Sequence, residues 1–104
     1  MLFRSHGFLE IVYKDALELE FRENKIAFER EKAYDIYYRG RLLPHKFYAD
    51  FVVFDSVILE IKSCAGLIDE HIAQTINYLK VSKCKVALLV NFGRGKLEYK
   101  RLVY

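Results

Sequence analysis

The sequence predicts an α/β fold in which a mixed β-sheet is flanked by two helices. Three observations support this prediction. Apolar residues recur at helical spacing in two segments, 7–24 and 68–82. The segments between and after these helices are rich in aromatic and β-branched residues, which favour strands. The resulting order is helix, three strands, helix, two strands, in which the second helix forms a crossover between two strands of one sheet.

Composition indicates a folded protein rather than a disordered one. The 104 residues suit one domain, and 53% of them are hydrophobic while 30% are charged. The net charge of +3 is compatible with a polyanionic partner without identifying one. The sequence contains neither a secretory signal nor an apolar run near ~18 residues, so we expect a cytoplasmic protein without membrane contact. Cys64 and Cys84 lack metal-site spacing and are expected to be free thiols.

The first predicted helix carries an acid in an apolar stripe. Two adjacent stripes run along residues 7–24: Leu9, Val12, Ala16 and Leu19 form one, and Glu10, Tyr13, Leu17 and Phe21 form the other. Taken alone, Glu10 is best explained as an edge carboxylate that reaches water. Beside the acids of the strands described next, a third metal-side carboxylate becomes the better explanation.

The stretch 47–63, FYADFVVFDSVILEIKS, carries the chemistry that the residues themselves suggest. It has the pattern of two apolar strands joined by a short turn, with Asp50 on the first strand and Glu60 and Lys62 on the second. An isolated charge in a buried strand costs several kcal/mol, so such groups are normally paired or bound to a metal. Two carboxylates suit a hard divalent cation, and Lys62 projects from the same face as Glu60.

The length of the turn decides whether the two acids can share a site. A two-residue turn at Asp55 and Ser56 would place Asp50 and Glu60 on opposite faces of the sheet. A three-residue loop over residues 55–57, or a β-bulge, would pair Asp50 with Lys62 and bring all three polar groups to one face. A metal site therefore predicts an odd loop or a bulge here.

Basic residues gather at two predicted turns. Between a strand over residues 26–38 and one that resumes at residue 46, Gly40 is expected to supply a positive φ. The loose basic group Arg39, Arg41, His45 and Lys46 fits either phosphate contact or a solvated surface. Arg94 and Lys96, in the turn between the last two strands, are a second candidate for phosphate contact or ordinary surface charges.

The second predicted helix presents polar side chains a short loop away from Lys62. Ile72, Ile76 and Leu79 are expected to pack inward, while His71, Gln74 and Tyr78 share a neighbouring face. Such residues are usually satisfied polar groups at the edge of a core, but the nearby Lys62 makes substrate contact a second explanation. After this helix, the continuous apolar run 85–91 is typical of a buried interior strand.

Several of these features together resemble the PD-(D/E)XK nuclease core, the fold of many restriction enzymes. Asp50 and the run Glu60, Ile61, Lys62 match its signature. Gln74 and Tyr78 match the QxxxY element of its exonuclease-type branch. The run GFLEIVY, residues 7–13, matches the GxxExxY motif that names a small prokaryotic group within the superfamily. Residues 71–80 and the ending ALLVNFGRGKLEYKR are also similar to that group.

The resemblance covers nearly the whole chain from Gly7 onward. It implies a restriction-endonuclease-like core in a single domain, 1–104. Members of the group carry more helix before the glycine, whereas six residues precede Gly7 here, so we expect a shortened first helix.

The implied chemistry is Mg²⁺-dependent hydrolysis of phosphodiester bonds in nucleic acid, with Mn²⁺ as an alternative ion and DNA as the expected substrate. The implied ligands are Asp50, Glu60, the Ile61 carbonyl and Glu10, the last directly or through water. Lys62 would orient the attacking water and stabilise charge in the transition state. Gln74 and Tyr78 would help to position Lys62 or the nucleic-acid strand.

Two other interpretations stay open. The domain could bind nucleic acid without turnover, although nothing about folding demands Lys62 beside Glu60. It could also be a protein-interaction domain in which Asp50, Glu60 and Lys62 form only a buried ion network. A chain of this size cannot easily surround a duplex, which makes a homodimer an expectation on geometric grounds.

Overall fold

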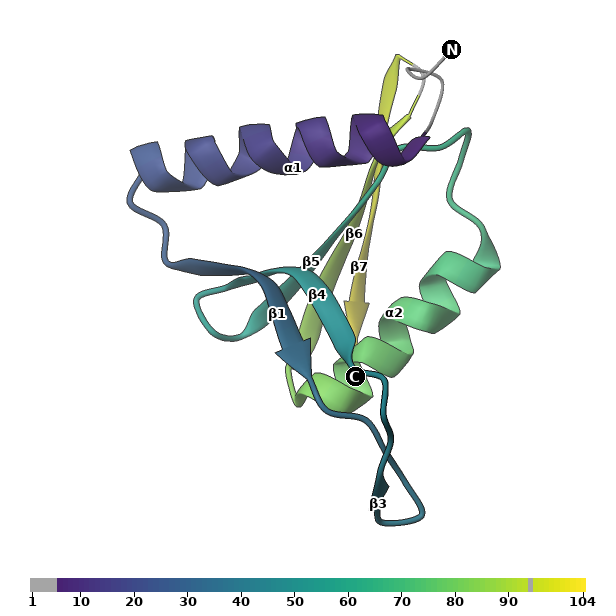
Figure 1. Cartoon of the computed structure of the whole chain (residues 1–104). Coiled ribbons are helices and arrows are strands. Elements are labelled where there is room, and N and C mark those ends of the chain that lie inside the picture. Colours follow the sequence, from purple (N-terminus) through teal and green to yellow (C-terminus); the bar gives the residue numbers. More distant parts are fainter. Residues whose placement is uncertain (1–5, 94) are drawn as a thin grey trace.

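The computed structural model describes residues 6–93 and 95–104, with side chains from Leu9 onward (Figure 1). The helices are α1 (His6–Glu23) and α2 (Asp69–Ser82). The strands are β1 (Phe28–Tyr34), β2 (Tyr37–Tyr38), β3 (Arg41–Leu42), β4 (Phe47–Val53), β5 (Val57–Lys62), β6 (Val86–Gly93) and β7 (Lys96–Val103). The segment expected as one strand over residues 26–38 is divided, because the chain leaves the sheet after Tyr34 and β2 pairs separately with β3.

Five strands form one mixed sheet in the order β1-β4-β5-β6-β7. Only β5 and β6 are parallel within it, and they are connected through α2, while the other neighbours are antiparallel. This arrangement confirms the α/β class and the mixed sheet. The apolar run in β6 is explained by its position between β5 and β7, where neither edge of the strand meets solvent.

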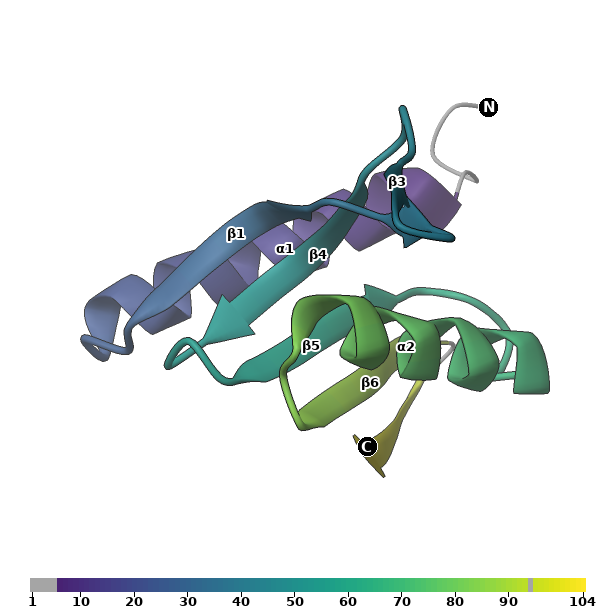
Figure 2. The same cartoon turned by 90° about the horizontal axis from the view of Figure 1, so that it is seen from below.

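The two helices cover opposite faces of the sheet, with α1 behind it and α2 in front of it in Figure 2. Each face has its own core cluster. On the α2 face, Leu79 of the helix packs with Phe47, Ala49, Val52, Ile58, Cys84 and Ala87. On the α1 face, Phe51, Leu59 and Ile61 pack against Tyr13, Leu17 and Phe21. Cys64 and Cys84 are free thiols, as expected.

The stripe of α1 that contains Tyr13 faces the sheet. Tyr13 stacks on Phe92 with ring centroids 4.5 Å apart, and Phe21 meets Phe51 edge-on at 5.4 Å. Phe51 is fully buried, which contributes roughly 1.5–3 kcal/mol of hydrophobic stabilisation. The other stripe is exposed at Leu9, Val12, Ala16 and Leu19. No helix among the described residues is long and apolar enough to span a membrane.

The β2–β3 hairpin extends beyond the end of the main sheet (Figure 1). Tyr38 pairs with Arg41, so Arg39 and Gly40 form a two-residue turn. Their φ angles are +52° and +76°, and a two-residue turn of the type I′ class needs positive φ at both positions. The expected positive φ of Gly40 is confirmed, and Arg39 adopts this conformation without the freedom of glycine.

Candidate active site

The site forms where β4 and β5 stop pairing. The two strands are paired at Phe51–Leu59, Val52–Ile58 and Val53–Val57 only. The same register places Asp50 opposite Glu60, but side chains replace the backbone hydrogen bonds there. The Asp50 backbone N–H donates to Glu60 Oε2 at 3.0 Å, and the Ile61 backbone N–H donates to Asp50 Oδ2 at 2.8 Å. The two carboxylates therefore occupy the space between separating strands and satisfy the backbone groups that the separation leaves.

The loop between these strands has the odd length that a shared site requires. It contains three residues, 54–56, with Phe54 and Asp55 at positive φ. The prediction of an odd loop is confirmed. The loop begins one residue earlier than expected, which places Asp50 opposite Glu60 rather than opposite Lys62.

A third acid lies on the other side of Asp50. In β1, Arg30 pairs with Phe51 and Lys32 pairs with Ala49, so Glu31 stands opposite Asp50. The φ of Glu31 is +54°, a left-handed conformation that costs an ordinary residue about 1–2 kcal/mol. Strained backbone of this kind is typical of sites under another constraint. Glu31, Asp50 and Glu60 thus lie at one level of three adjacent strands.

The pleat of β4 is interrupted at this level. Phe47 and Ala49 face α2, whereas Phe51 and Val53 face α1, although an unbroken strand would keep all four on one face. Asp50 lies at the change of face. This explains how its carboxylate bonds to a residue of β5 on one side and reaches the helix α1 on the other.

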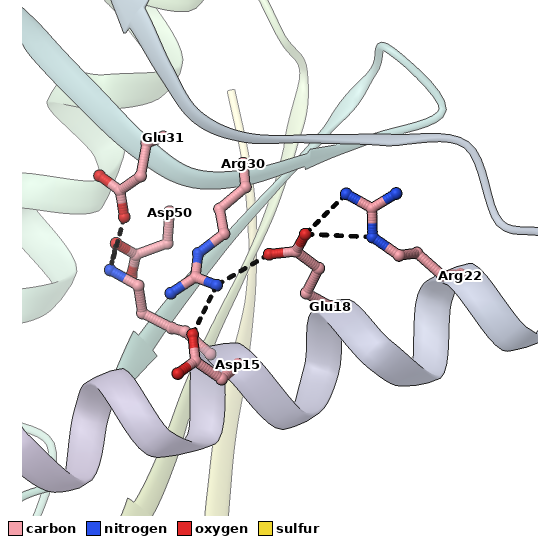
Figure 3. Close-up of polar contacts among 7 residues, drawn as sticks. Asp15, Glu18, Arg22, Arg30, Glu31 and Asp50 are labelled. Carbon is pink, nitrogen blue, oxygen red and sulfur yellow. Dashed lines mark hydrogen bonds and ion pairs between the residues drawn. The ribbon is translucent and has the colours of Figure 1, made fainter.

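Lys14 of α1 joins two of the acids. Its Nζ lies 3.0 Å from Asp50 Oδ1 and 2.6 Å from Glu31 Oε2, and Figure 3 shows the Glu31 and Asp50 side chains next to each other above this helix. The side chains of Lys14 and Asp50 are 13% and 15% exposed, so water screens this contact only partly. Burial lowers the pKa of Lys14, but the hydrogen bonds to Glu31 and Asp50 outweigh it and raise the pKa above its usual value.

Glu60 is buried beside these charges. Burial, reinforced by the charge of Asp50, raises the pKa of Glu60 to about 8, although the Asp50 backbone N–H, Lys62 and Lys14 act in the opposite direction. Without a bound cation, Glu60 therefore holds a proton at neutral pH. A divalent cation beside Asp50 would favour the ionised form of Glu60.

Lys62 is half-buried at the end of β5, opposite Asn91 of β6. Side chains alternate along a strand, so it projects from the face that carries Glu60. Its charge is one of the causes that lower the pKa of Glu60, which indicates that the two groups interact. The predicted pair of an acid and an amine on one face is therefore present at the edge of the strand separation.

Tyr78 of α2 lies near the acids, and Gln74 precedes it by one helical turn. Burial raises the pKa of Tyr78, and the charges of Glu60 and Asp50 raise it further. The Tyr78 ring stacks on Phe47 at 3.5 Å between centroids. Gln74 is exposed on the same helix face. His71 has a local role at the start of α2, where its Nδ1 accepts a hydrogen bond from the Ile68 N–H at 3.2 Å.

The residues suited to hold a divalent cation are Asp50 and Glu60, which bring two carboxylates together between separated strands. Carboxylate oxygens are the ligands that Mg²⁺ and Mn²⁺ prefer, so the residues fit such an ion. Among the described residues no group of three or more His, Cys, Asp or Glu side chains is placed to hold a metal. Glu10, expected as a further ligand, lies one turn before Lys14 on α1. The Ile61 carbonyl and water are the other ligand sources of the expected set.

The basic residues expected to contact nucleic acid differ in their surroundings. Arg39 and Arg41 are exposed on the β2–β3 hairpin, and Lys96 is exposed at the start of β7. Lys46 forms an ion pair with Asp35 at 2.7 Å. Arg94 lies outside the described residues.

A buried amide positions the loop that follows Lys62. Asn91 is 1% exposed, its Oδ1 accepts from the Cys64 N–H at 2.9 Å, and its Nδ2 donates to the Cys64 carbonyl at 3.1 Å and to Glu98 Oε1 at 3.0 Å. Glu98 Oε1 also accepts from the Leu67 N–H at 3.1 Å. This network ties the chain after Lys62 to β6 and β7, and so fixes the direction in which the chain leaves the site.

Sequence reasoning missed Lys14, Glu31 and Asn91. The spacing of Lys14 from Glu10, four residues on a helix, was a usable signal, because it places both on one face. Glu31 gave no signal, since an acid in the run FEREKAY is ordinary on an exposed strand face. Asn91 ends an apolar strand, and a polar residue there with Glu98 across the turn was a weak indication of a network.

Comparison with known proteins assigns the family. A model of the PD-(D/E)XK nuclease superfamily matches residues 4–102, and the chain belongs to this superfamily. A search of curated proteins finds no significant match.

Two solved structures share the fold. The protein SSO0001 has a TM-score of 0.76 and 20% identity, over 93% of this chain and 50% of its own. An alkaline exonuclease (LHK-Exo) from Laribacter hongkongensis has a TM-score of 0.51 and 13% identity, over 88% of this chain and 54% of its own. At these identities the likeness concerns the fold alone. The chain spans about half the length of both proteins.

Proposed function

We propose that the protein is a metal-dependent nuclease that hydrolyses phosphodiester bonds in DNA, with Mg²⁺ or Mn²⁺ as its cofactor. The observation that carries the proposal is the contact of Asp50 with Glu60 at the strand separation, with Lys62 on the same face, in a chain of the PD-(D/E)XK superfamily. Within the superfamily, the motif from Gly7 to Tyr13 favours the GxxExxY group.

Each residue has a role that its surroundings support. Asp50 and Glu60 would hold the cation, which would supply charge neutralisation at the phosphate and a more acidic water. A bound cation would favour the ionised form of Glu60 and so oppose the effect of burial, which raises the pKa of this carboxyl group. Lys62 donates hydrogen bonds to the attacking water or to the phosphate.

The remaining residues act around this centre. Glu31 would keep Lys14 near the site if a cation replaced the ammonium as the partner of Asp50, because Lys14 pairs with both carboxylates. Gln74 and Tyr78 contact the nucleic-acid strand on the α2 face. The exposed cations Arg39, Arg41 and Lys96 meet phosphates farther from the cut.

A cleavage assay tests the proposal. Pure protein is incubated with labelled single-stranded, duplex and branched DNA in Mg²⁺, Mn²⁺, Ca²⁺ or chelator. We expect cleavage in Mg²⁺ or Mn²⁺, loss of cleavage in Asp50→Ala and Lys62→Ala, and no loss in Lys100→Ala, which removes an exposed lysine of β7. Absence of cleavage in every metal, or equal cleavage by all variants, contradicts the proposal.

A nucleic-acid-binding domain without turnover is the second candidate. It is favoured by the ion pair between Lys14 and Asp50, which already neutralises one of the two acids. The described residues also contain no cluster of three or more side chains placed to hold a metal. Retained DNA binding with no cleavage and no Mg²⁺-dependent change in stability would support this candidate.

We further propose that the protein is cytoplasmic and forms a homodimer. Sedimentation at several concentrations tests the homodimer.

A further inference from the structure

The β2–β3 hairpin exposes aromatic rings next to arginines. Tyr37 is 63% exposed and Tyr38 is 60% exposed. An isolated two-stranded hairpin is only marginally stable in water, and contiguous exposed apolar surface is typical of contact sites. Folding alone does not account for two tyrosines at this position.

The two faces of the hairpin differ in character. Cross-strand partners share a face, so Tyr38 lies beside Arg41, whereas Tyr37 lies beside Leu42. The guanidinium of Arg39 lies over the Tyr38 ring, 5.4 Å from its centroid. One face therefore combines an exposed ring with two cations, and we call Tyr38, Arg39 and Arg41 the platform.

The charge of the platform is available to a ligand. Lys46 neutralises Asp35 at the base of the hairpin. Neither Arg39 nor Arg41 forms an ion pair with a carboxylate in the described part of the chain. Arg39 also holds a left-handed backbone, which costs about 1–2 kcal/mol, where asparagine or glycine would avoid most of that strain.

The platform lies on the side of the sheet that carries α2. Ile36 packs against the α2-face core, and residues two apart on a strand share a face, so Tyr38 continues the side begun by Ile36. The Leu43 N–H donates to the Ile36 carbonyl at 2.8 Å, which extends the hairpin pairing to this point. Tyr78 and Gln74 of α2 lie on this side too. Tyr38 follows Glu31, which stands opposite Asp50, by seven residues along the chain. At about 3.3 Å per strand residue, the distance from the level of Asp50 to Tyr38 is at most roughly 23 Å, a span of several nucleotides.

We propose that the platform binds unpaired nucleotides of the strand that enters the active site, with a base stacked on Tyr38 and phosphates held by Arg39 and Arg41. Stacking on a tyrosine requires a base whose face is free, and only single-stranded nucleic acid offers this along its length. Stacking tolerates any sequence because every base has a π-face, so the platform selects single strands over duplex with little selection of sequence. This inference rests on the proposed function, because it names the form of nucleic acid that the proposed nuclease takes as its substrate.

Binding measurements on the full chain test the inference separately from catalysis. The probe is a labelled single-stranded oligothymidylate with Ca²⁺ in place of Mg²⁺, compared with the same strand carrying abasic residues and with a blunt duplex. We expect Tyr38→Ala to weaken binding of the single strand by about 5- to 100-fold, the range for loss of one stacked base, and to leave duplex binding unchanged. Tyr38→Phe should keep the affinity because it keeps the ring.

Two controls make the result specific. Tyr99→Ala removes a tyrosine of similar exposure from β7, at the opposite edge of the sheet, and should have no effect. The wild type should bind the abasic strand more weakly than the ordinary strand. The Tyr38→Ala variant should bind both strands with the same affinity, because it has already lost the ring on which a base would stack. Far-UV circular dichroism and the urea midpoint report whether each variant is folded.

Other outcomes overturn the inference and leave the nuclease proposal intact. Equal binding by Tyr38→Ala and the wild type, or an equal loss on single strand and duplex, contradicts base stacking. A change in sedimentation with unchanged DNA affinity would assign the hairpin to contact between copies of the chain. Conversely, Tyr38-dependent single-strand binding without cleavage in any metal would contradict the proposed hydrolysis and support the platform.

Discussion

At the scale of single residues, the candidate site combines two ammonium groups, of Lys14 and Lys62, with three carboxylates. Asp50, Glu60 and Lys62 could be predicted from the sequence, because charges in an apolar strand need partners. Whether the loop between the strands has an odd or an even number of residues decides whether these side chains share a face. Lys14 and Glu31 could not be predicted in the same way. Their positions depend on how α1 crosses the sheet and on a left-handed residue in β1, and neither is encoded in a local pattern.

The exchange of Lys14 for a cation can be measured. Lys14→Met keeps the apolar stem and removes the ammonium, which leaves Asp50 and Glu31 without their partner and should destabilise the metal-free protein by roughly 1–3 kcal/mol. Mg²⁺ should then stabilise this variant more than it stabilises the wild type, because the cation replaces the missing charge. Urea unfolding with Mg²⁺ and with chelator gives both values. Lys100→Met is the control, and equal stabilisation of the wild type and Lys14→Met by Mg²⁺ would refute the exchange.

The raised pKa of Glu60 predicts how stability depends on pH. Its pKa is about 8 in the folded chain, against 4.5 for an ordinary glutamate. Between these values the folded state holds a proton that the unfolded state has lost, so the metal-free protein should lose stability as pH rises through this window and no further above it. The contribution is at most about 5 kcal/mol, since the two pKa values differ by about 3.5 units and each unit corresponds to about 1.4 kcal/mol.

Glu60→Gln isolates this contribution. The amide has nearly the same shape and does not titrate, so the difference in unfolding free energy between the wild type and this variant should fall from about pH 5 to about pH 8. Other carboxylates shift in the opposite direction, as Glu98 does because Asn91 and the Leu67 N–H lower its pKa, and the difference removes their effect. Parallel pH profiles of the two proteins would show that Glu60 is ionised throughout.

At the scale of elements, strand separation and loop closure build the site. The sequence was sufficient to locate the two helices and the strand segments, since their apolar periods are long and distinct. It was insufficient for the β2–β3 hairpin as a separate element, because YDIYY, residues 34–38, is rich in aromatic residues and so reads as the continuation of a strand. The point where the chain leaves the sheet depends on whether a strand partner is present beyond the pair of Tyr34 with Phe47. This is tertiary information, which a local sequence pattern does not contain.

The loop after Lys62 requires glycine at the end of β6. A Cβ on Gly93 would collide with the Cys64 carbonyl oxygen, which is backbone and cannot move aside cheaply. We therefore expect Gly93→Ala to cost roughly 1–3 kcal/mol and to lower cleavage by displacing the chain that follows Lys62. Gly66→Ala is the matched control in the same loop, because its Cβ would meet only Glu98 Oε1 at 3.8 Å. Urea unfolding and the cleavage rate are measured for both variants, and similar losses in the two would contradict a specific close approach.

At the scale of the whole molecule, the sheet separates two cores that hold the two helices independently. The α2 core includes a helix residue, Leu79, that is fully buried, whereas the helix residues of the α1 core, Tyr13, Leu17 and Phe21, are only partly buried. The mixed sheet and its flanking helices could be predicted from the order of elements. Which helix is held more weakly could not be predicted from the sequence, because it depends on how much surface each helix buries against the sheet.

The weaker attachment of α1 leads to a prediction about the site itself. Phe21→Ala removes a ring that meets both Phe28 and Phe51 at 5.4 Å, and should cost roughly 2–3 kcal/mol, less than for a fully buried ring because Phe21 is only partly buried. Much of that loss should appear as local opening of α1, because the strands keep their own pairing and the α2 core. Hydrogen exchange should then show faster exchange over residues 9–23 and little change in β5 and β6. Leu79→Ala is the counterpart on the other face, and loss of the Leu79 side chain should accelerate exchange throughout the sheet.

Because Lys14 and Glu10 move with α1, Phe21→Ala should also lower cleavage more than Leu79→Ala does at equal global stability. Uniform acceleration of exchange in both variants would show instead that the two faces unfold as one unit.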